Sequence, residues 1–255
     1  MSEARRGQSD EAFVLHSYPY RESSLLLETF TRQHGRVSMI ARGARRPRSA
    51  LRGLLLSFQP LALSWFGKGE VRTLKGAEWQ GGLALLQGEA LMCGFYLNEL
   101  LLRLLPREDP HEALYERYRH VLAMLSAPVA GPGAIATPQP APQPSQAVLR
   151  SFEKALLAEL GYAMSLEHEG GSGRALEPEA LYSYDPERGP IEIADAESAP
   201  EPHLRGRALL AMARDDYSEA ETLAQAKALM RLLINHRLDY QPLRSRRIFR
   251  ELLEM

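Results

Sequence analysis

Residues 36–53 read RVSMIARGARRPRSALRG, a short alternating segment followed at once by a group of arginines. In its first part Val37, Met39 and Ala41 recur every second residue, which is the period of a half-buried strand. Its second part holds five arginines and no acidic residue: Arg42, Arg45, Arg46, Arg48 and Arg52. The stretch therefore predicts a strand that runs directly into a basic loop.

Four other short segments of the first 79 residues have the same strand character. They are rich in Val, Leu, Ile, Phe, Tyr and Trp and are separated by turn signals containing Pro or Gly. These segments are AFVLHSY (12–18), SSLLLETFT (23–31), LLSFQPLALSWF (55–66) and EVRTLKGAEW (70–79). Five short strands within about 70 residues predict a small closed barrel of the oligonucleotide-binding (OB) type, or a compact antiparallel sheet.

After Trp79 the sequence changes to helical patterns. We expect helices over 83–105, 111–125, 145–162, 203–213 and 219–238, and a short basic amphipathic segment over 242–255. Residues 128–145 are rich in proline and predict an extended linker. Residues 167–201 hold ten acidic residues and predict a loop with at most one hairpin. The expected fold is α+β, with an OB-type domain over 1–79 and a mainly helical domain over 80–255.

Charge is divided unevenly between these two parts. Residues 1–79 hold 13 Lys and Arg against 7 Asp and Glu, whereas residues 80–255 hold 18 against 25. No carboxylate lies between Glu28 and Glu70, although eight Lys or Arg do. A chain with a net charge of −1 is thus predicted to carry one strongly positive face.

The basic stretch favours an anionic polymer as partner. One alternative is an ordinary solvated loop, but these arginines have no neighbouring carboxylate, and the guanidinium group suits bidentate contact with phosphate. Tyr18, Tyr20 and Trp65 lie at strand ends, where a ring can face outward and stack on a nucleic-acid base. Phe30 and Phe58 are interpreted as barrel core.

Catalytic and metal-binding patterns are missing from the sequence. It has no phosphate-binding loop, dinucleotide fingerprint, zinc-protease motif or nucleophile elbow, and no two of its histidines have the spacing of a zinc pair. Its single cysteine, Cys93, excludes an internal disulfide and suits the cytosol. We expect neither a secretory signal nor a membrane span, and predict a protein that is not an enzyme and needs no cofactor or metal.

Several motifs together resemble a known family. They are VLHSYPYRESSLLLETFTRQHGRVSMIARGARRP (14–47), LLLSFQPLALSWFGKGEVRTL (54–74), GFYLNELLLRLLPREDPHEALYERY (94–118), RSFEKALLAELGY (150–162) and PLRSRRIFRELL (242–253). In this order they closely resemble the RecO family of bacterial DNA repair proteins. The resemblance covers nearly the whole chain, apart from the first dozen residues and the linker.

The resemblance implies a recombination mediator. RecO-like proteins bind single- and double-stranded DNA, anneal complementary strands, and interact with RecR and with the acidic, apolar C-terminal tail of the single-strand-DNA-binding protein. They thereby help load RecA onto coated strands. By this resemblance the DNA role falls on Arg36, Arg42, Arg45, Arg46 and Lys68, to which the basic stretch adds Arg48 and Arg52. Tail binding is expected at Arg150, with Arg246 and Arg247 as further candidates, in a cytoplasmic, nucleoid-associated monomer.

One departure from the family concerns zinc. Many RecO-like proteins carry a four-cysteine zinc site after the L-G-Y motif, but residues 160–190 of this chain contain no cysteine. The chain thus resembles a zinc-free branch in which the acidic segment replaces the metal module. Two other functional classes stay open, namely a helical scaffold whose basic loop binds an acidic protein, and a DNA-processing nuclease. The nuclease is disfavoured because the basic part of the chain has no carboxylate cluster for a metal.

Overall fold

The computed structural model describes residues 8–126 and 145–253. The chain divides into two compact units, one made of Met1–Pro142 with Leu243–Met255 and the other of Gln143–Pro242. The sequence predicts a domain boundary after Trp79. That position lies inside the first unit, between the barrel and the helices, and the division of the chain into these two domains stays a prediction. The predicted proline-rich linker lies almost wholly outside the described residues.

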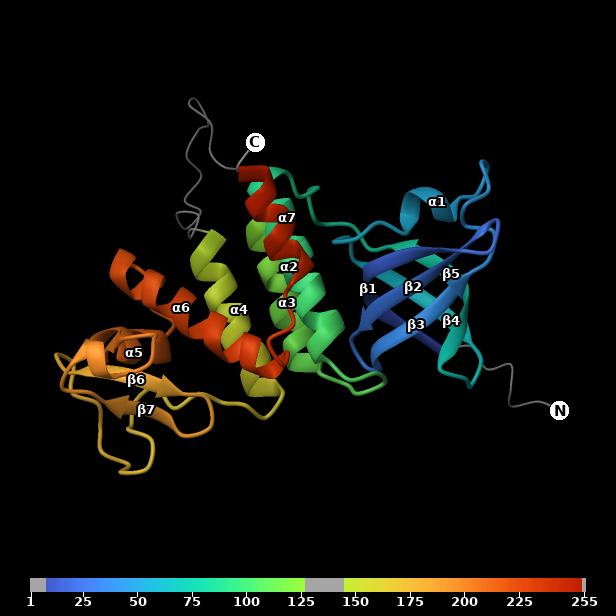
Figure 1. Ribbon diagram of the computed structural model, residues 1–255. Coiled ribbons are helices and arrows are strands. Elements are labelled where there is room, and N and C mark those ends of the chain that lie inside the picture. Colours follow the sequence, from blue (N-terminus) through green and yellow to red (C-terminus); the bar gives the residue numbers. More distant parts are fainter. Residues whose placement is uncertain (1–7, 127–144, 254–255) are drawn as a thin grey trace. The chain divides into compact units, whose positions relative to one another are not determined.

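Five strands of the first unit close into a barrel with the order β1-β2-β3-β5-β4 (Figure 1). They are β1 (Gln8–Tyr20), β2 (Ser24–Thr31), β3 (Gly35–Ala41), β4 (Leu61–Phe66) and β5 (Val71–Trp79). β3 and β5 run parallel, with Ser38 opposite Val71, and all other neighbours are antiparallel. The short helix α1 (Leu51–Leu54) lies between β3 and β4. The prediction of a five-stranded barrel of OB type is confirmed.

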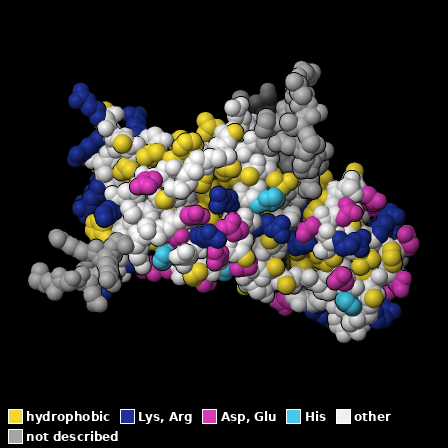
Figure 2. Space-filling model, turned by 180° about the vertical axis from the view of Figure 1, so that it is seen from behind, with side chains coloured by type: hydrophobic (Ala, Val, Ile, Leu, Met, Phe, Trp, Pro, Cys, Tyr) yellow, Lys and Arg dark blue, Asp and Glu magenta, His cyan; other side chains and the backbone are white. Residues whose placement is uncertain are grey.

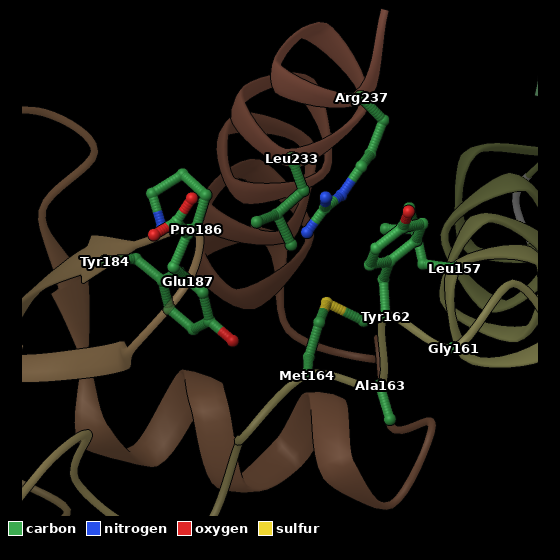
Figure 3. Close-up of a pocket in the computed structure, with 10 residues that line it drawn as sticks. All are labelled: Leu157, Gly161, Tyr162, Ala163, Met164, Tyr184, Pro186, Glu187, Leu233 and Arg237. Carbon is green, nitrogen blue, oxygen red and sulfur yellow. The ribbon is translucent and has the colours of Figure 1, made fainter.

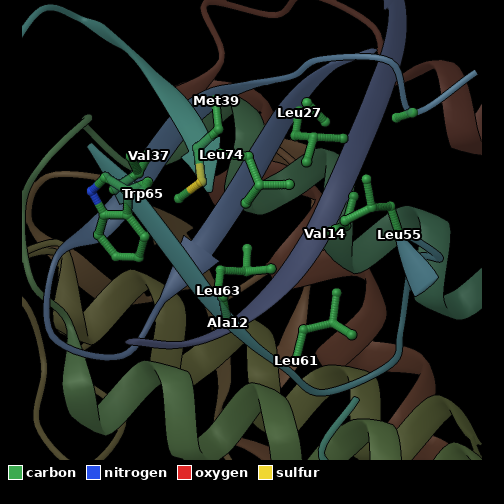
Figure 4. Close-up of a cluster of buried hydrophobic side chains, with 12 residues drawn as sticks. Ala12, Val14, Leu27, Val37, Met39, Leu55, Leu61, Leu63, Trp65 and Leu74 are labelled. Carbon is green, nitrogen blue, oxygen red and sulfur yellow. The ribbon is translucent and has the colours of Figure 1, made fainter. Parts of the chain in front are cut away.

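The barrel is filled by the apolar side chains of alternating positions (Figure 4). In β3, Val37, Met39 and Ala41 are buried in this core, as the two-residue period predicts. In β4 the same alternation carries Leu61, Leu63 and Trp65 inward. Burial of these side chains stabilises the barrel by about 1.5–3 kcal/mol for each large one.

Three helices complete the first unit: α2 (Gly88–Leu104), α3 (Glu112–Ser126) and α7 (Arg244–Leu253). The sequence predicts a start for α2 near Leu83, but the helix begins at Gly88. The helix does not reach back to Leu83 because Gln87, the residue before it, has an extended backbone with φ −134° and ψ 157°. Residues 80–87 are therefore irregular, and Leu85 is exposed.

Aromatic packing and one buried amide hold α2 and α3 against the barrel. The Asn98 amide donates to the carbonyl of Leu15 at 2.8 Å and accepts a hydrogen bond from the Tyr118 hydroxyl at 2.5 Å. Phe13 packs against Tyr115 and Tyr118, with ring centroids 5.5 and 5.2 Å apart. Burial raises the pKa of both tyrosines, so their hydroxyls stay neutral hydrogen-bonding groups.

Arg36 joins the barrel to the end of α2. Its guanidinium donates to the carbonyls of Leu102 and Leu105, two residues at the C-terminal end of the helix. A cation here satisfies carbonyls that lack a helical partner and complements the negative end of the helix dipole. Glu28 lies 3.8 Å from the same guanidinium. Burial lowers the pKa of Arg36, and the charge of Glu28 opposes that shift.

Gly35 is required by the chain segment that follows α2. A Cβ atom at Gly35 would lie 1.9 Å from the carbonyl oxygen of Asp109, and its φ of 65° also favours glycine. The amide of Glu108 donates to the carbonyl of Arg36 at 3.0 Å, so this segment runs directly along the start of β3.

The second unit combines helices with a small sheet. Its helices are α4 (Ser145–Glu159), α5 (Gly206–Ala213) and α6 (Ala220–Arg237), with a 3-10 turn at Ala196–Ser198. The sheet has the order β7-β6-β8, formed by β6 (Leu181–Asp185), β7 (Gly189–Glu192) and β8 (Leu204–Arg205). The predicted hairpin is present as β6 and β7, and β8 is a third strand that the pattern did not reveal.

We predict that Arg36→Met destabilises the first unit by about 3 kcal/mol, because it leaves carbonyls at the end of α2 without their donor and removes one of the two cations beside buried Glu28. Urea unfolding followed by circular dichroism measures the change. Arg42→Met is the matched control and should stay within about 0.5 kcal/mol of the parent, since Arg42 is exposed. Equal stability of the two variants would contradict this role of Arg36.

Candidate nucleic-acid interface

The arginine loop, residues 42–52, is fastened to the barrel near its start. Ala44 is fully buried in the barrel core. The amide of Arg45 donates to the carbonyl of Ser23 at 2.9 Å, and its guanidinium donates to the carbonyls of Arg21 and Glu22 at 3.3 and 3.4 Å. The loop therefore lies against the β1–β2 turn, and its position is set by the barrel.

All five arginines of this loop are exposed, namely Arg42, Arg45, Arg46, Arg48 and Arg52. Within the parts of the chain that the structure describes, none of the five forms an ion pair with a carboxylate. Figure 2 shows Lys and Arg side chains gathered at the edge of the barrel, at the left of the view, with few acidic side chains between them. Five uncompensated guanidinium groups on one short loop make a positive surface that attracts polyanions.

Other arginines of the barrel are used within the fold. Arg32 lies 2.8 Å from Glu112 of α3, and Arg72 lies 2.7 Å from Glu108. The prediction that Arg36 contacts DNA is wrong. Its guanidinium is half-buried and donates to carbonyls at the C-terminal end of α2. It is therefore not part of the exposed positive surface.

Lys68 is exposed but lies apart from the arginine loop. It belongs to the β4–β5 turn, which precedes Val71, the partner of Ser38. The arginine loop follows Ala41, three residues further along β3, which corresponds to about 10 Å of strand. The structure thus groups the five loop arginines and leaves Lys68 on another turn of the barrel.

Two of the three aromatic candidates, Tyr18 and Trp65, differ in exposure. Tyr18 is 45 % exposed, and its ring meets that of His16 edge to face at 4.3 Å, so it faces outward as predicted. Trp65 is buried to 1 % exposure within the barrel core, and its ring N–H donates to Gln8 at 2.9 Å. The interpretation of Trp65 as a stacking platform is wrong, because its parity in β4 is that of the core residues.

Part of the outer barrel face is already occupied. In OB-type barrels the face of strands 2 and 3 commonly binds oligonucleotides. Here the Phe30 ring of β2 packs against Tyr115 of α3 at 5.5 Å, and Glu28 pairs with Arg107 at 2.9 Å. The accessible part of this face is therefore its other end, beside the β1–β2 turn and the arginine loop.

The β1–β2 turn contributes the third aromatic candidate, Tyr20, and two residues that sequence reasoning missed, Arg21 and Ser24. Tyr20, Arg21 and Ser24 line an open depression of about 400 Å³ together with Ile40, Arg42 and Arg46. Arg21 stands isolated in the sequence, some 20 residues before the arginine loop, so only the pairing of β2 with β3 reveals that it belongs to the same surface.

The residues expected to bind an acidic tail belong to both units. Arg150, the first candidate, is buried in α4, and its guanidinium pairs with Glu153 at 3.0 Å. The prediction that Arg150 binds the tail is therefore wrong, because its guanidinium is used inside the second unit. Arg246 and Arg247 belong to α7 of the first unit. Arg246 donates to the Tyr96 hydroxyl at 3.1 Å, while Arg247 is exposed.

The second unit has a depression of about 310 Å³ that combines apolar and charged side chains (Figure 3). Leu157, Met164 and Leu233 give it apolar walls. The guanidinium of Arg237 lies 3.4 Å from the centre of the Tyr162 ring, a cation–π contact that holds a positive charge at the edge of the depression. Tyr162 is the tyrosine of the L-G-Y motif.

Arg174 joins two carboxylates, one in the loop and one in β7, within the acidic segment. Arg174 pairs with Glu169 at 2.8 Å and with Glu192 at 3.0 Å. A hydrogen bond from Ser172, followed by those from Arg174, lowers the pKa of Glu169. Within the described ranges, no three His, Cys, Asp or Glu side chains come together as metal ligands would.

Among the helices of the described residues, none has the length and apolar character to span a bilayer.

The fold and the exposed loop define a protein built on an OB-type barrel that carries a basic surface. Comparison with known families narrows this class. The family models described as "Recombination protein O N terminal" and "Recombination protein O C terminal" match residues 5–82 and 85–247. The chain therefore belongs to the RecO family of DNA repair proteins, as its motifs predicted.

Full-length relatives agree with this assignment. The chain is 52 % identical to a DNA repair protein RecO of Aromatoleum aromaticum over 256 residues, which cover 100 % of both chains. It is 51 % identical to one of Dechloromonas aromatica, over 97 % of both chains. A third, from Thiobacillus denitrificans, is 51 % identical over 100 % of this chain and 96 % of its own length.

Proposed function

We propose that this protein is a recombination mediator that binds single- and double-stranded DNA through its arginine loop. One observation carries the proposal: five exposed arginines without a carboxylate partner among the described residues are fastened to an OB-type barrel. The family adds the wider role, which is annealing of complementary strands and, with RecR, loading of RecA onto DNA coated by the single-strand-DNA-binding protein.

Binding by this loop rests on phosphate contacts. Each arginine that neutralises a phosphate releases condensed counterions, so affinity falls as salt rises. Phosphate contacts carry no base information, so binding tolerates any sequence. Annealing then needs no covalent chemistry, because the positive surface reduces repulsion between two polyanions and holds them at high local concentration.

The two alternative functions, a scaffold for acidic proteins and a nuclease, would give different results with DNA. A scaffold that binds acidic proteins would leave a labelled oligonucleotide free even at low salt. A nuclease would cleave DNA in the presence of Mg²⁺. We propose a protein that does neither.

Replacing Arg42, Arg46, Arg48 and Arg52 together with Ala should weaken binding of a labelled single strand by at least about tenfold. The slope of log affinity against log salt should become less steep by about 0.7 for each phosphate contact that is lost. Arg45 is kept because its hydrogen bonds fasten the loop. Fluorescence anisotropy between about 50 and 200 mM salt measures both effects.

The matched control removes the same charge elsewhere, at four exposed arginines: Arg117, Arg188, Arg214 and Arg231. This variant should keep most of the parent affinity and slope. Equal losses in the two variants would show that net charge alone matters, and an unchanged affinity of the loop variant would remove the loop from the DNA site.

We further propose that the depression beside Arg237 and Tyr162 takes the acidic, apolar tail of the single-strand-DNA-binding protein. Its apolar walls suit the apolar end of such a tail, and the Arg237 guanidinium suits a carboxylate.

Arg237→Gln should weaken binding of a labelled peptide, made of several aspartates and an apolar C-terminal residue, by about tenfold, the effect of losing about 1.4 kcal/mol. Arg231→Gln, on an exposed position of the same helix, is the control and should bind as the parent does. If Arg247→Gln weakens the peptide and Arg237→Gln does not, the tail binds on α7.

A further inference from the structure

The depression between the β1–β2 turn and the arginine loop is lined by positively charged, apolar and hydroxyl side chains. Arg42 and Arg46 come from the loop, and Arg21 comes from the turn. Tyr20 and Ile40 provide apolar surface between these charges, and Ser24 provides a hydroxyl. Phosphate binding alone would require the charges but not the apolar side chains. The apolar wall therefore indicates a ligand that also has an apolar part.

Strand register explains how these side chains meet. Tyr20 of β1 is paired with Ser24 of β2, and Leu26 is paired with Ile40 of β3. Leu25 and Leu27 pack in or against the barrel core, so the alternate positions Ser24 and Leu26 face outward. The aromatic wall on β1 and the aliphatic wall on β3 therefore lie on either side of β2 in the barrel.

The loop and the turn hold the charges around this wall. The Arg21 guanidinium lies 5.3 Å from the centre of the Tyr20 ring. The amide of Gly43 donates to the Ser24 hydroxyl at 3.4 Å, and the amide of Arg46 donates to the carbonyl of Gly43 at 3.1 Å. No acidic side chain is among the residues that line the depression, and Glu22, in the same turn, does not reach it.

The size fits one nucleotide. A depression of about 400 Å³ falls within the range of about 300–1,000 Å³ that is usual for small-molecule sites. A nucleotide combines a planar ring, which packs on aromatic and aliphatic side chains, with an anion that arginines bind. A base inside a duplex is stacked and paired and cannot turn into such a depression without first leaving the helix.

We infer that this depression takes one unpaired nucleotide, with its base against Tyr20 and Ile40 and its phosphate on Arg42 and Arg46. The inference rests on the proposed DNA binding and deepens it by naming the form of DNA that the site distinguishes. Single strands gain a base contact that duplexes lack. When two strands pair, the nucleotide leaves the depression, which weakens the hold on the product and frees the protein for another pair of strands.

The test compares three labelled DNAs of equal length on the full-length protein: a single strand, a single strand in which every base is replaced by an abasic site, and a duplex. The parent protein should bind the ordinary strand about 5- to 150-fold more tightly than the abasic strand, the range expected for one stacked base. Equal affinity of these two strands, which carry the same phosphates, would overturn the inference without any substitution.

Tyr20→Leu should bring the affinity for the single strand down towards that for the abasic strand. It should leave the abasic and duplex affinities and the salt slope unchanged. Phe66→Leu is the matched control, because Phe66 is an exposed aromatic residue at the β4–β5 turn of the same barrel, and this change should leave all three affinities as they are.

The outcomes separate the inference from the proposed function. If Tyr20→Leu has no effect while the four-arginine variant loses DNA, the depression does not hold a base but the loop still binds phosphates. If the parent binds none of the DNAs, both ideas fail. If an aspartate-rich peptide displaces the single strand from the parent but not from Tyr20→Leu, and the abasic strand binds as well as the ordinary one, the depression is a peptide site.

Discussion

The position of the arginine loop depends on a small apolar side chain and one guanidinium. Ala44 is fully buried in the barrel, and Arg45 donates to two carbonyls of the β1–β2 turn. Without these contacts, five neighbouring positive charges would favour an extended loop, because like charges repel. Burial of Ala44 and the hydrogen bonds of Arg45 offset that repulsion, so Arg42 and Arg46 stay beside the same turn.

The barrel divides its basic residues between two tasks. Arg32, Arg36 and Arg72 meet carboxylates of the helices or of the chain around them. The arginines of the loop meet none within the described parts of the chain, in keeping with the absence of Asp and Glu between Glu28 and Glu70. The first set stabilises the unit, and the second set keeps its charge available for a polyanion. The proposed base site lies where the second set meets an apolar part of the barrel surface.

Sequence patterns predicted the barrel because alternation has a direct physical meaning in a strand. Val37, Met39 and Ala41 are inside as expected. The same rule applied to Leu61, Leu63 and Trp65 would have placed Trp65 inside as well; its location at a strand end next to a turn was the weaker signal. The i, i+3 spacing of Arg150 and Glu153 likewise indicated an ion pair within one helix turn.

Other features depend on contacts between distant parts of the chain. Nothing near Arg36 reveals that the end of α2, more than 60 residues later, lies over its guanidinium. Arg21 and Tyr20 join the arginine loop only through the pairing of strands. Sequence periodicity predicts which face of a strand is buried, but not which later element covers the other face.

Photo-crosslinking tests the central claim most directly. A single strand containing 4-thiothymidine is bound to the protein and irradiated to form crosslinks. The protein is then cut with a protease that cleaves on the C-terminal side of glutamate. Because no Asp or Glu lies between Glu28 and Glu70, this cleavage releases residues 29–70, with the whole arginine loop, as one fragment. The account predicts that this fragment carries the main crosslink and loses it when the four loop arginines are replaced. Crosslinks confined to fragments from residues 143–242 would contradict it.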